Sequence, residues 1–125
     1  MTGALRWIMA VAALSLLVAA ALHAGLVLPG PFNDAAMYET GVASVLIVGL
    51  GLTFIEPAWA RWGGLGASVL ALAGASIGLY IALRGLGPNT VADIVYHVAL
   101  IALLLVGIVV AWRVPTRRLP SAESR

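Results

Sequence analysis

Two side chains capable of metal binding or acid–base chemistry lie four residues apart at the start of the last apolar segment. They are Asp93 and His97, within the polar stretch 87–97. Residues four apart share one face of an α-helix, so a helix here would point the carboxylate and the imidazole the same way. Ionisable groups inside an apolar segment are costly and usually face a bundle interior or a wet cavity. The pair therefore marks a candidate site.

Two further ionisable residues, His23 and Glu39, fall at a similar depth in other apolar segments. His23 lies six residues before Pro29, and Glu39 lies six residues after Asn33. At 1.5 Å per residue, these side chains and His97 all lie about 9 to 10 Å along their helices from the nearest connection. In a square four-helix bundle they could meet in one cavity. The predicted cluster consists of His23, Glu39, Asp93 and His97.

Several chemistries fit this cluster, and the sequence leaves them open. Two imidazoles and two carboxylates suit a divalent transition metal such as zinc, or iron or manganese in a carboxylate-rich site. Alternatively, His23 and His97 could be the axial ligands of a b-type haem, with Arg84 near a propionate. A third hypothesis is a non-catalytic accessory or structural subunit whose polar residues are only hydrogen-bonded inside the bundle. A lipid-hydrolysing metal centre would need an open coordination position.

Each residue of the cluster also has a purely structural interpretation. The spacing Thr90-x-x-Asp93 matches a capping box, in which Asp93 would serve the start of a helix. Glu39 could pair with a histidine or with Arg84 to neutralise its charge. Each histidine could donate to a backbone carbonyl. Motifs for other catalysis, such as a phosphate-binding glycine loop or H-E-x-x-H, are absent from the sequence, and the chemistry therefore favours a binding protein over an enzyme.

The composition places these residues in a membrane protein. Of 125 residues, 62% are hydrophobic and 10% are charged, and the mean hydropathy is +1.07, whereas soluble domains carry about 25% charged residues. There is no cysteine, which excludes disulfides and thiolate chemistry. The net charge of +2 is too small to indicate a nucleic-acid partner. The lipid bilayer is the predicted partner.

Four apolar segments are long enough to cross a bilayer, which takes about 20 helical residues. Short connections separate them and favour an up-down-up-down bundle, an all-α membrane domain over residues 1–112. A cleavable signal peptide is the alternative for the first segment, with an A-x-A-like site at 19–21. The expected helices are 5–28, 35–55, 64–83 and 91–112, followed by a polar tail at 113–125.

Arginine placement predicts the orientation. Six arginines fall on one side of an alternating bundle and only Arg84 on the other, so the positive-inside rule places both termini in the cytoplasm and the chain in the cytoplasmic membrane. Glu56 is interpreted as the salt-bridge partner of an arginine at this side, namely Arg6, Arg61 or Arg113. An aromatic belt is expected at the same face, formed by Trp7, Trp59, Trp62 and Trp112.

Small residues form a stripe along the third segment. Gly74 and Gly78 are a small-xxx-small pair, a pattern that lets helix backbones approach closely. The contact could lie inside the bundle, between two copies of the chain, or with a larger membrane complex.

Three patterns together suggest a family. They are Leu22-His23-Ala24-Gly25, Glu39 early in the second segment, and Gly87-Pro88-Asn89-Thr90 followed by Asp93 and Tyr96-His97. The chain resembles a group of uncharacterised small bacterial four-helix membrane proteins with L-H-x-G at the end of the first helix and G-P-x-T-x-x-D-x-x-Y-H at the start of the last. This resemblance implies a fold and a location for a site, and no particular reaction.

Overall fold

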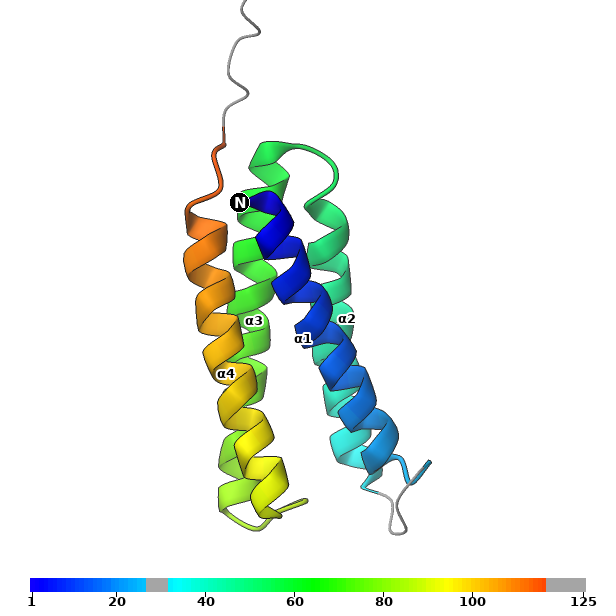
Figure 1. Cartoon of the computed structure of the whole chain (residues 1–125). Helices are drawn as coiled ribbons and strands as arrows, with labels where there is room; N and C mark the ends of the chain where they lie inside the picture. Colours follow the sequence, from blue (N-terminus) through cyan, green and yellow to red (C-terminus); the bar gives the residue numbers. More distant parts are fainter. Residues whose placement is uncertain (27–31, 117–125) are drawn as a thin grey trace, which may run out of the picture.

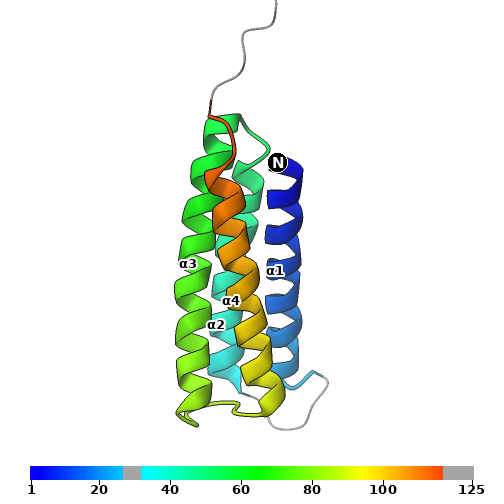
Figure 2. The ribbon, with the colours of Figure 1, turned by 60° about the vertical axis from the view of Figure 1, so that its left-hand side comes forward.

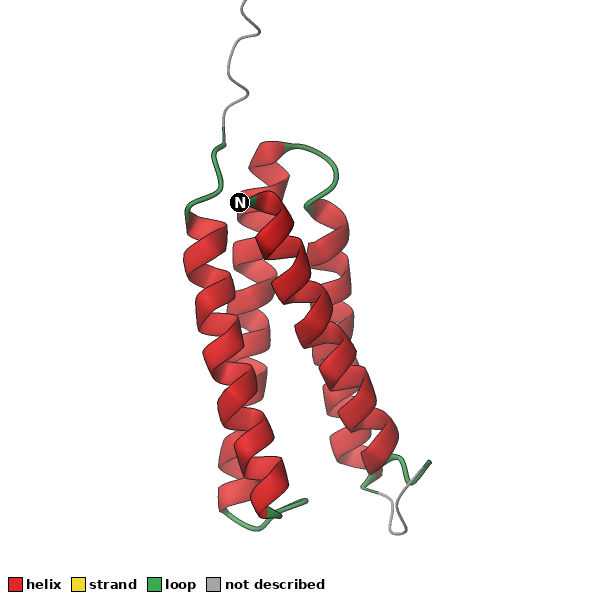
Figure 3. Ribbon diagram, in the orientation of Figure 1, coloured by secondary structure: helices red, strands yellow, loops and turns green. Residues whose placement is uncertain are grey.

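The computed structural model describes residues 1–26 and 32–116 and consists of helices and connecting loops. The helices are α1 (Thr2–His23), α2 (Asn33–Leu52), α3 (Pro57–Leu83) and α4 (Val91–Trp112) (Figure 1). The described ranges contain no strand (Figure 3). Each helix is long and apolar enough to span a membrane. The predicted all-α fold with four membrane-spanning helices is therefore confirmed, while most of the expected tail at 113–125 lies outside the described residues.

The helices alternate in direction around a square. α1 packs against α2 and α4, and α3 packs against the same two helices (Figure 2). The beginning of α1 and the end of α4 lie at one end of the bundle (Figure 1), here called the terminal end. The opposite end, here called the distal end, carries the end of α1, the start of α2 and the connection 84–90. This is the predicted up-down-up-down arrangement.

The helices differ from the expected segments mainly at their ends. α1 stops at His23 because the chain turns at Ala24 and Gly25, and Gly25 has a φ of 78°, which favours glycine. The last residues expected in this helix, 27 and 28, lie outside the described residues. α3 begins at Pro57 instead of residue 64, since proline is well suited to the first turn of a helix. The aromatic and cationic residues 59–62 thus belong to α3.

Small residues let α3 approach its neighbours inside the chain. A Cβ atom at Gly64 would lie 2.7 Å from Leu5 Cδ2 of α1, and one at Gly74 would lie 2.7 Å from Val42 Cγ2 of α2. On α2, Gly49 faces Ala67 of α3 in the same way. Close backbone approach of this kind increases the van der Waals contact that helps to hold helices together in lipid. The largest fully buried apolar side chains are Leu5, Met9, Leu46, Leu104 and Val114.

At the terminal end an arginine joins α1 to the end of α2. Arg6 Nε donates to Thr53 Oγ1 at 3.1 Å, its Nη2 donates to the Thr53 carbonyl at 2.6 Å, and the guanidinium lies 3.9 Å from the ring centre of Phe54. The expected ion pair between Glu56 and Arg6, Arg61 or Arg113 is absent from the described residues. Arg6 instead donates to the hydroxyl and the carbonyl of Thr53, and carbonyls at the end of a helix lack a partner within the helix.

The bundle is more open at the distal end. α1 packs mainly on α2, and α3 mainly on α4, with a weaker contact between α1 and α4. The two pairs diverge toward the distal end (Figure 1). The polar residues of the predicted cluster lie in this wider part.

Candidate functional site

The centre of the cluster is a hydrogen bond between α1 and α2. Nδ1 of His23, the last residue of α1, lies 2.8 Å from Oε2 of Glu39. Both groups are largely shielded, with side-chain exposures of 15% and 5%. An ionised carboxylate can only accept, so the Nδ1–H of His23 donates this hydrogen bond to Glu39, and the tautomer that does so has Nε2 as its unprotonated nitrogen.

Asp93 of α4 adds a second carboxylate on the other side of this ring. Its Oδ1 lies 3.8 Å from His23 Nε2 and 3.6 Å from His97 Nδ1. Both distances are too long for a direct hydrogen bond. The structure therefore brings the four predicted residues together from three helices, with Glu39 and Asp93 beside the imidazole of His23 and with His97 beside Asp93.

Only half of the predicted capping box forms at the start of α4. Its backbone N–H donates to Thr90 Oγ1 at 3.1 Å, which makes Thr90 the N-cap of α4. Its carboxylate is turned inward to the histidines, with a side-chain exposure of 8%. The predicted use of the Asp93 carboxylate as a helix-start device is therefore not observed, and Thr90 alone caps α4.

His97 is held more tightly by its own helix and by α3. Its Nδ1 donates to the backbone carbonyl of Asp93 at 2.9 Å, so Nε2 is the acceptor nitrogen of the neutral ring. The ring lies against Gly78, where a Cβ atom would come 2.8 Å from His97 Cδ2. Tyr96 stacks edge-on with the same ring at 5.3 Å between ring centres. A hydrogen bond to a backbone carbonyl is the structural interpretation given above for each histidine.

The depth count from the sequence assumed that His23, Glu39 and His97 all lie inside their helices. His23 ends α1, whereas Glu39 and His97 lie inside their helices. The Phe32 N–H, just before α2, donates to the His23 carbonyl at 2.6 Å and so holds the start of α2 beside the end of α1. The end of α1 thus lies beside Glu39 of α2, as the bond between His23 and Glu39 also shows.

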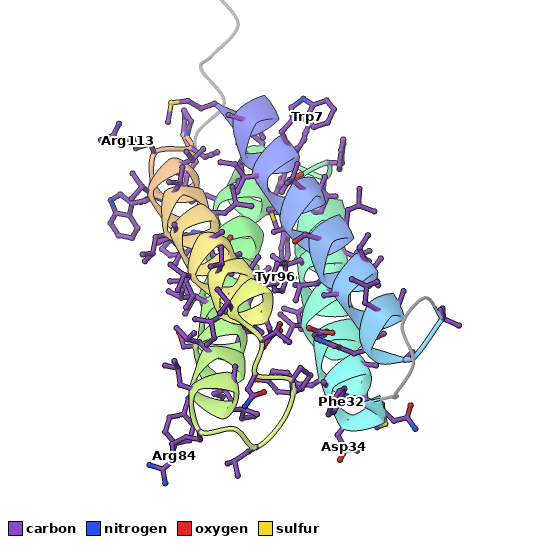
Figure 4. All side chains as sticks on the ribbon, turned by 60° about the horizontal axis from the view of Figure 1, so that its bottom comes forward. Trp7, Phe32, Asp34, Arg84, Tyr96 and Arg113 are labelled. Carbon is purple, nitrogen blue, oxygen red and sulfur yellow. The ribbon has the colours of Figure 1, made fainter. Side chains whose placement is uncertain are left out.

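A cavity of about 720 Å³ opens beside the cluster at the distal end. Its polar wall contains all four cluster residues together with the exposed residues Asn33 and Asp34. Phe32 and Asp34 are at the distal end and Tyr96 is deeper between the helices (Figure 4). The volume falls in the range of small-molecule pockets, about 300 to 1,000 Å³. The apolar part of the wall comes from Phe32, Tyr38, Ile81, Ala82, Leu86 and Pro88.

Three supporting residues did not figure in the predicted cluster. Gly78 makes room for the His97 ring, and Phe32 lies edge-on to the His23 ring at 6.5 Å between ring centres. Tyr38 donates to the Gly74 carbonyl at 3.2 Å and so joins α2 to α3 beside the cavity. The signal for Gly78 was present in the sequence as a small-residue stripe, but its partner on another helix was not.

The arrangement bears on metal and haem binding in different ways. No set of three or more His, Asp or Glu side chains within the described ranges is arranged to hold a metal ion. His23 Nε2 and Asp93 Oδ1 do face one another across 3.8 Å. For haem, the Asp93 carboxylate contacts both imidazoles, and His97 Nε2 lies against Gly78. The geometry offers haem no support.

Comparison with known proteins gives no match to a family model, to a curated protein or to a solved structure. The resemblance to uncharacterised bacterial membrane proteins stays a prediction. The class of protein follows from the fold itself: the chain has the architecture of a multi-pass membrane protein, with a polar cluster at one end of a four-helix bundle.

Proposed function

We propose that this multi-pass membrane protein binds a divalent transition-metal ion at the distal end, between Nε2 of His23 and the carboxylate of Asp93. The observation that carries the proposal is the 3.8 Å separation of these two atoms. Zinc bonds of about 2.0 to 2.2 Å hold two ligand atoms about 3.4 Å apart at a tetrahedral angle and at most about 4.2 Å apart. A small cation between them would also relieve the repulsion between two facing lone pairs.

Glu39 would orient the metal ligand without touching the metal. A histidine that binds a metal commonly donates its other N–H to a carboxylate, which fixes the tautomer and strengthens the ligand. The 2.8 Å bond between His23 Nδ1 and Glu39 has this form. Breaking it would weaken metal binding even though both metal-binding atoms remain.

Two protein ligands leave coordination positions open toward the cavity. Water or a small solute would complete the shell, which suits a site that exchanges its ion better than a closed structural site. Nitrogen and oxygen donors without thiolate favour zinc, iron or manganese over copper(I). His97 would position Asp93 through the α4 backbone. For His97 itself to bind the metal, as the sequence predicted, the His97 ring would have to turn.

Equilibrium dialysis against Zn²⁺ tests the proposal on the full chain in detergent. We expect His23→Ala and Asp93→Asn to lose zinc binding and His97→Gln to keep most of it. Equal zinc binding by wild type and by both His23→Ala and Asp93→Asn would overturn the proposal. A wild-type chain that binds no zinc, iron or manganese would overturn it as well.

A second candidate is a non-catalytic accessory subunit in which the cluster only ties helices together. It is favoured by the direct bond between α1 and α2 and by the carbonyl partner of His97. In that case the variants would lower the unfolding temperature, and zinc would not raise it in the wild type. A metal at 100 times its Kd would stabilise the folded chain by about 2.7 kcal/mol, so the two candidates are separable.

Docking of another chain through Gly74 and Gly78 gains less support. Val42 of α2 and His97 of α4 occupy the space beside these glycines. A second copy or a larger complex would have to displace them or use another face.

A further inference from the structure

Arg61 lies at the terminal end, where the first turns of α3 meet the end of α4. Its guanidinium carbon lies 4.7 Å from the ring centre of Trp112 and 5.4 Å from that of Trp62. Stacking on an indole covers the flat face of a guanidinium and leaves its terminal N–H groups to donate to a carboxylate or phosphate.

This guanidinium has no acceptor among the described residues. Its Nε is shielded and without a hydrogen-bond partner, and no carboxylate in the described ranges forms an ion pair with an arginine. Arg6 at the same end is different, because Thr53 accepts two of its hydrogen bonds. A half-buried cation with five donors needs a counter-charge.

The surroundings of Arg61 have the character of a membrane interface. Four tryptophans at this end are exposed, between 49% and 75%, and they are Trp7, Trp59, Trp62 and Trp112. Exposed tryptophans of this kind mark the level of lipid headgroups. Arg113, next to Trp112 in the chain, extends outward at the terminal end (Figure 4) and adds a second cation.

We propose that Arg61, with Trp62 and Trp112, binds the phosphate of an anionic phospholipid at the terminal end of the bundle. Two N–H groups of the guanidinium would donate to two phosphate oxygens, and the indoles would contact the glycerol region and the first methylenes of the acyl chains. Arg113 adds attraction for a net negative headgroup. This site is independent of the cluster at the distal end.

The test compares full-length wild type with Arg61→Gln and, as a matched control, Arg84→Gln. Arg84 also lies near an aromatic ring, Tyr80 at 5.8 Å, but at the distal end. Each chain is placed in nanodiscs of phosphatidylcholine alone or with phosphatidylglycerol, and phospholipid that stays bound after detergent extraction is counted by native mass spectrometry.

We expect wild type and Arg84→Gln to retain phosphatidylglycerol, and Arg61→Gln to bind it about fivefold more weakly, as expected for one interfacial arginine. Arg61→Lys should bind at an intermediate level because it keeps the charge and loses the planar fork. Equal retention by wild type and Arg61→Gln would overturn the proposal. So would a preference for phosphatidylcholine in the wild type. If Arg61→Gln fails to fold, the weaker phosphatidylglycerol binding expected of Arg61→Lys tests the proposal by itself, and wild-type binding by Arg61→Lys would then overturn it.

Discussion

The imidazole of His97 on α4 lies directly against Gly78 on α3, with no room for a methyl group between them. This contact fixes the ring that lines the inner wall of the cavity. Gly78→Ala should therefore push the ring away and weaken its bond to the Asp93 carbonyl. Overpacking of this kind costs about 1 to 3 kcal/mol, and we expect a lower unfolding temperature in detergent.

Gly66→Ala is the control for that substitution. Gly66 lies on the same helix, and a Cβ atom there would meet nothing within 4 Å. Alanine should be tolerated at this position or should stabilise the helix by up to about 1 kcal/mol. If both substitutions change stability equally, the contact between Gly78 and His97 is not important for packing.

Glu39→Gln should weaken zinc binding while leaving both metal-binding atoms in place. The amide keeps the shape of the side chain but loses the charge that holds His23 Nδ1 at 2.8 Å. Loss of such a supporting carboxylate costs about 10-fold to 100-fold in metal affinity. Equilibrium dialysis measures the change, with Asp34→Asn as control, because Asp34 lines the same cavity but is exposed. Equal losses in both variants would indicate a general charge effect instead of an oriented ligand.

Thr90→Ala should destabilise the start of α4 by about 1 kcal/mol, since the Thr90 hydroxyl accepts from the Asp93 N–H. Hydrogen exchange should become faster at the first amides of α4. Thr40→Ala is the control, because its hydroxyl only bonds to the Ala36 carbonyl of its own helix. The backbone of Asp93 would also be less fixed, so zinc binding should fall with stability in Thr90→Ala and not in Thr40→Ala.

The fold could be predicted because it depends on features that the sequence states directly. Four apolar segments of sufficient length and short connections leave few arrangements in lipid. Pro57 was the main difficulty, since a proline reads equally well as the end of one helix and as the first turn of the next. The earlier start of α3 at Pro57 moved Arg61 and Trp62 from a loop into a helix.

The cluster could be predicted only as a set of residues. Counting depth along each helix brought His23, Glu39 and His97 to one level, but rotation of each helix decides which atoms face one another. The His97 ring turned to the carbonyl of Asp93, and the His23 ring took the central place between two carboxylates. Neither orientation is encoded in spacing, because both depend on packing against other helices, as at Gly78.

The contact between Arg6 and Thr53 gives a last prediction, on stability at the terminal end. Thr53→Val keeps the shape of the side chain and removes the hydroxyl that accepts from Arg6 Nε, at a residue only 2% exposed. A charged donor that loses its acceptor costs about 1 to 3 kcal/mol, although the Thr53 carbonyl still accepts from Nη2. We expect the lower half of that range from thermal unfolding, and a smaller loss for Thr53→Ser, which keeps the hydroxyl.

Combining Thr53→Val with Arg6→Ala should cost less than the sum of the two single changes, by about 0.5 kcal/mol or more. Strict additivity would mean that the hydroxyl and the guanidinium do not stabilise one another.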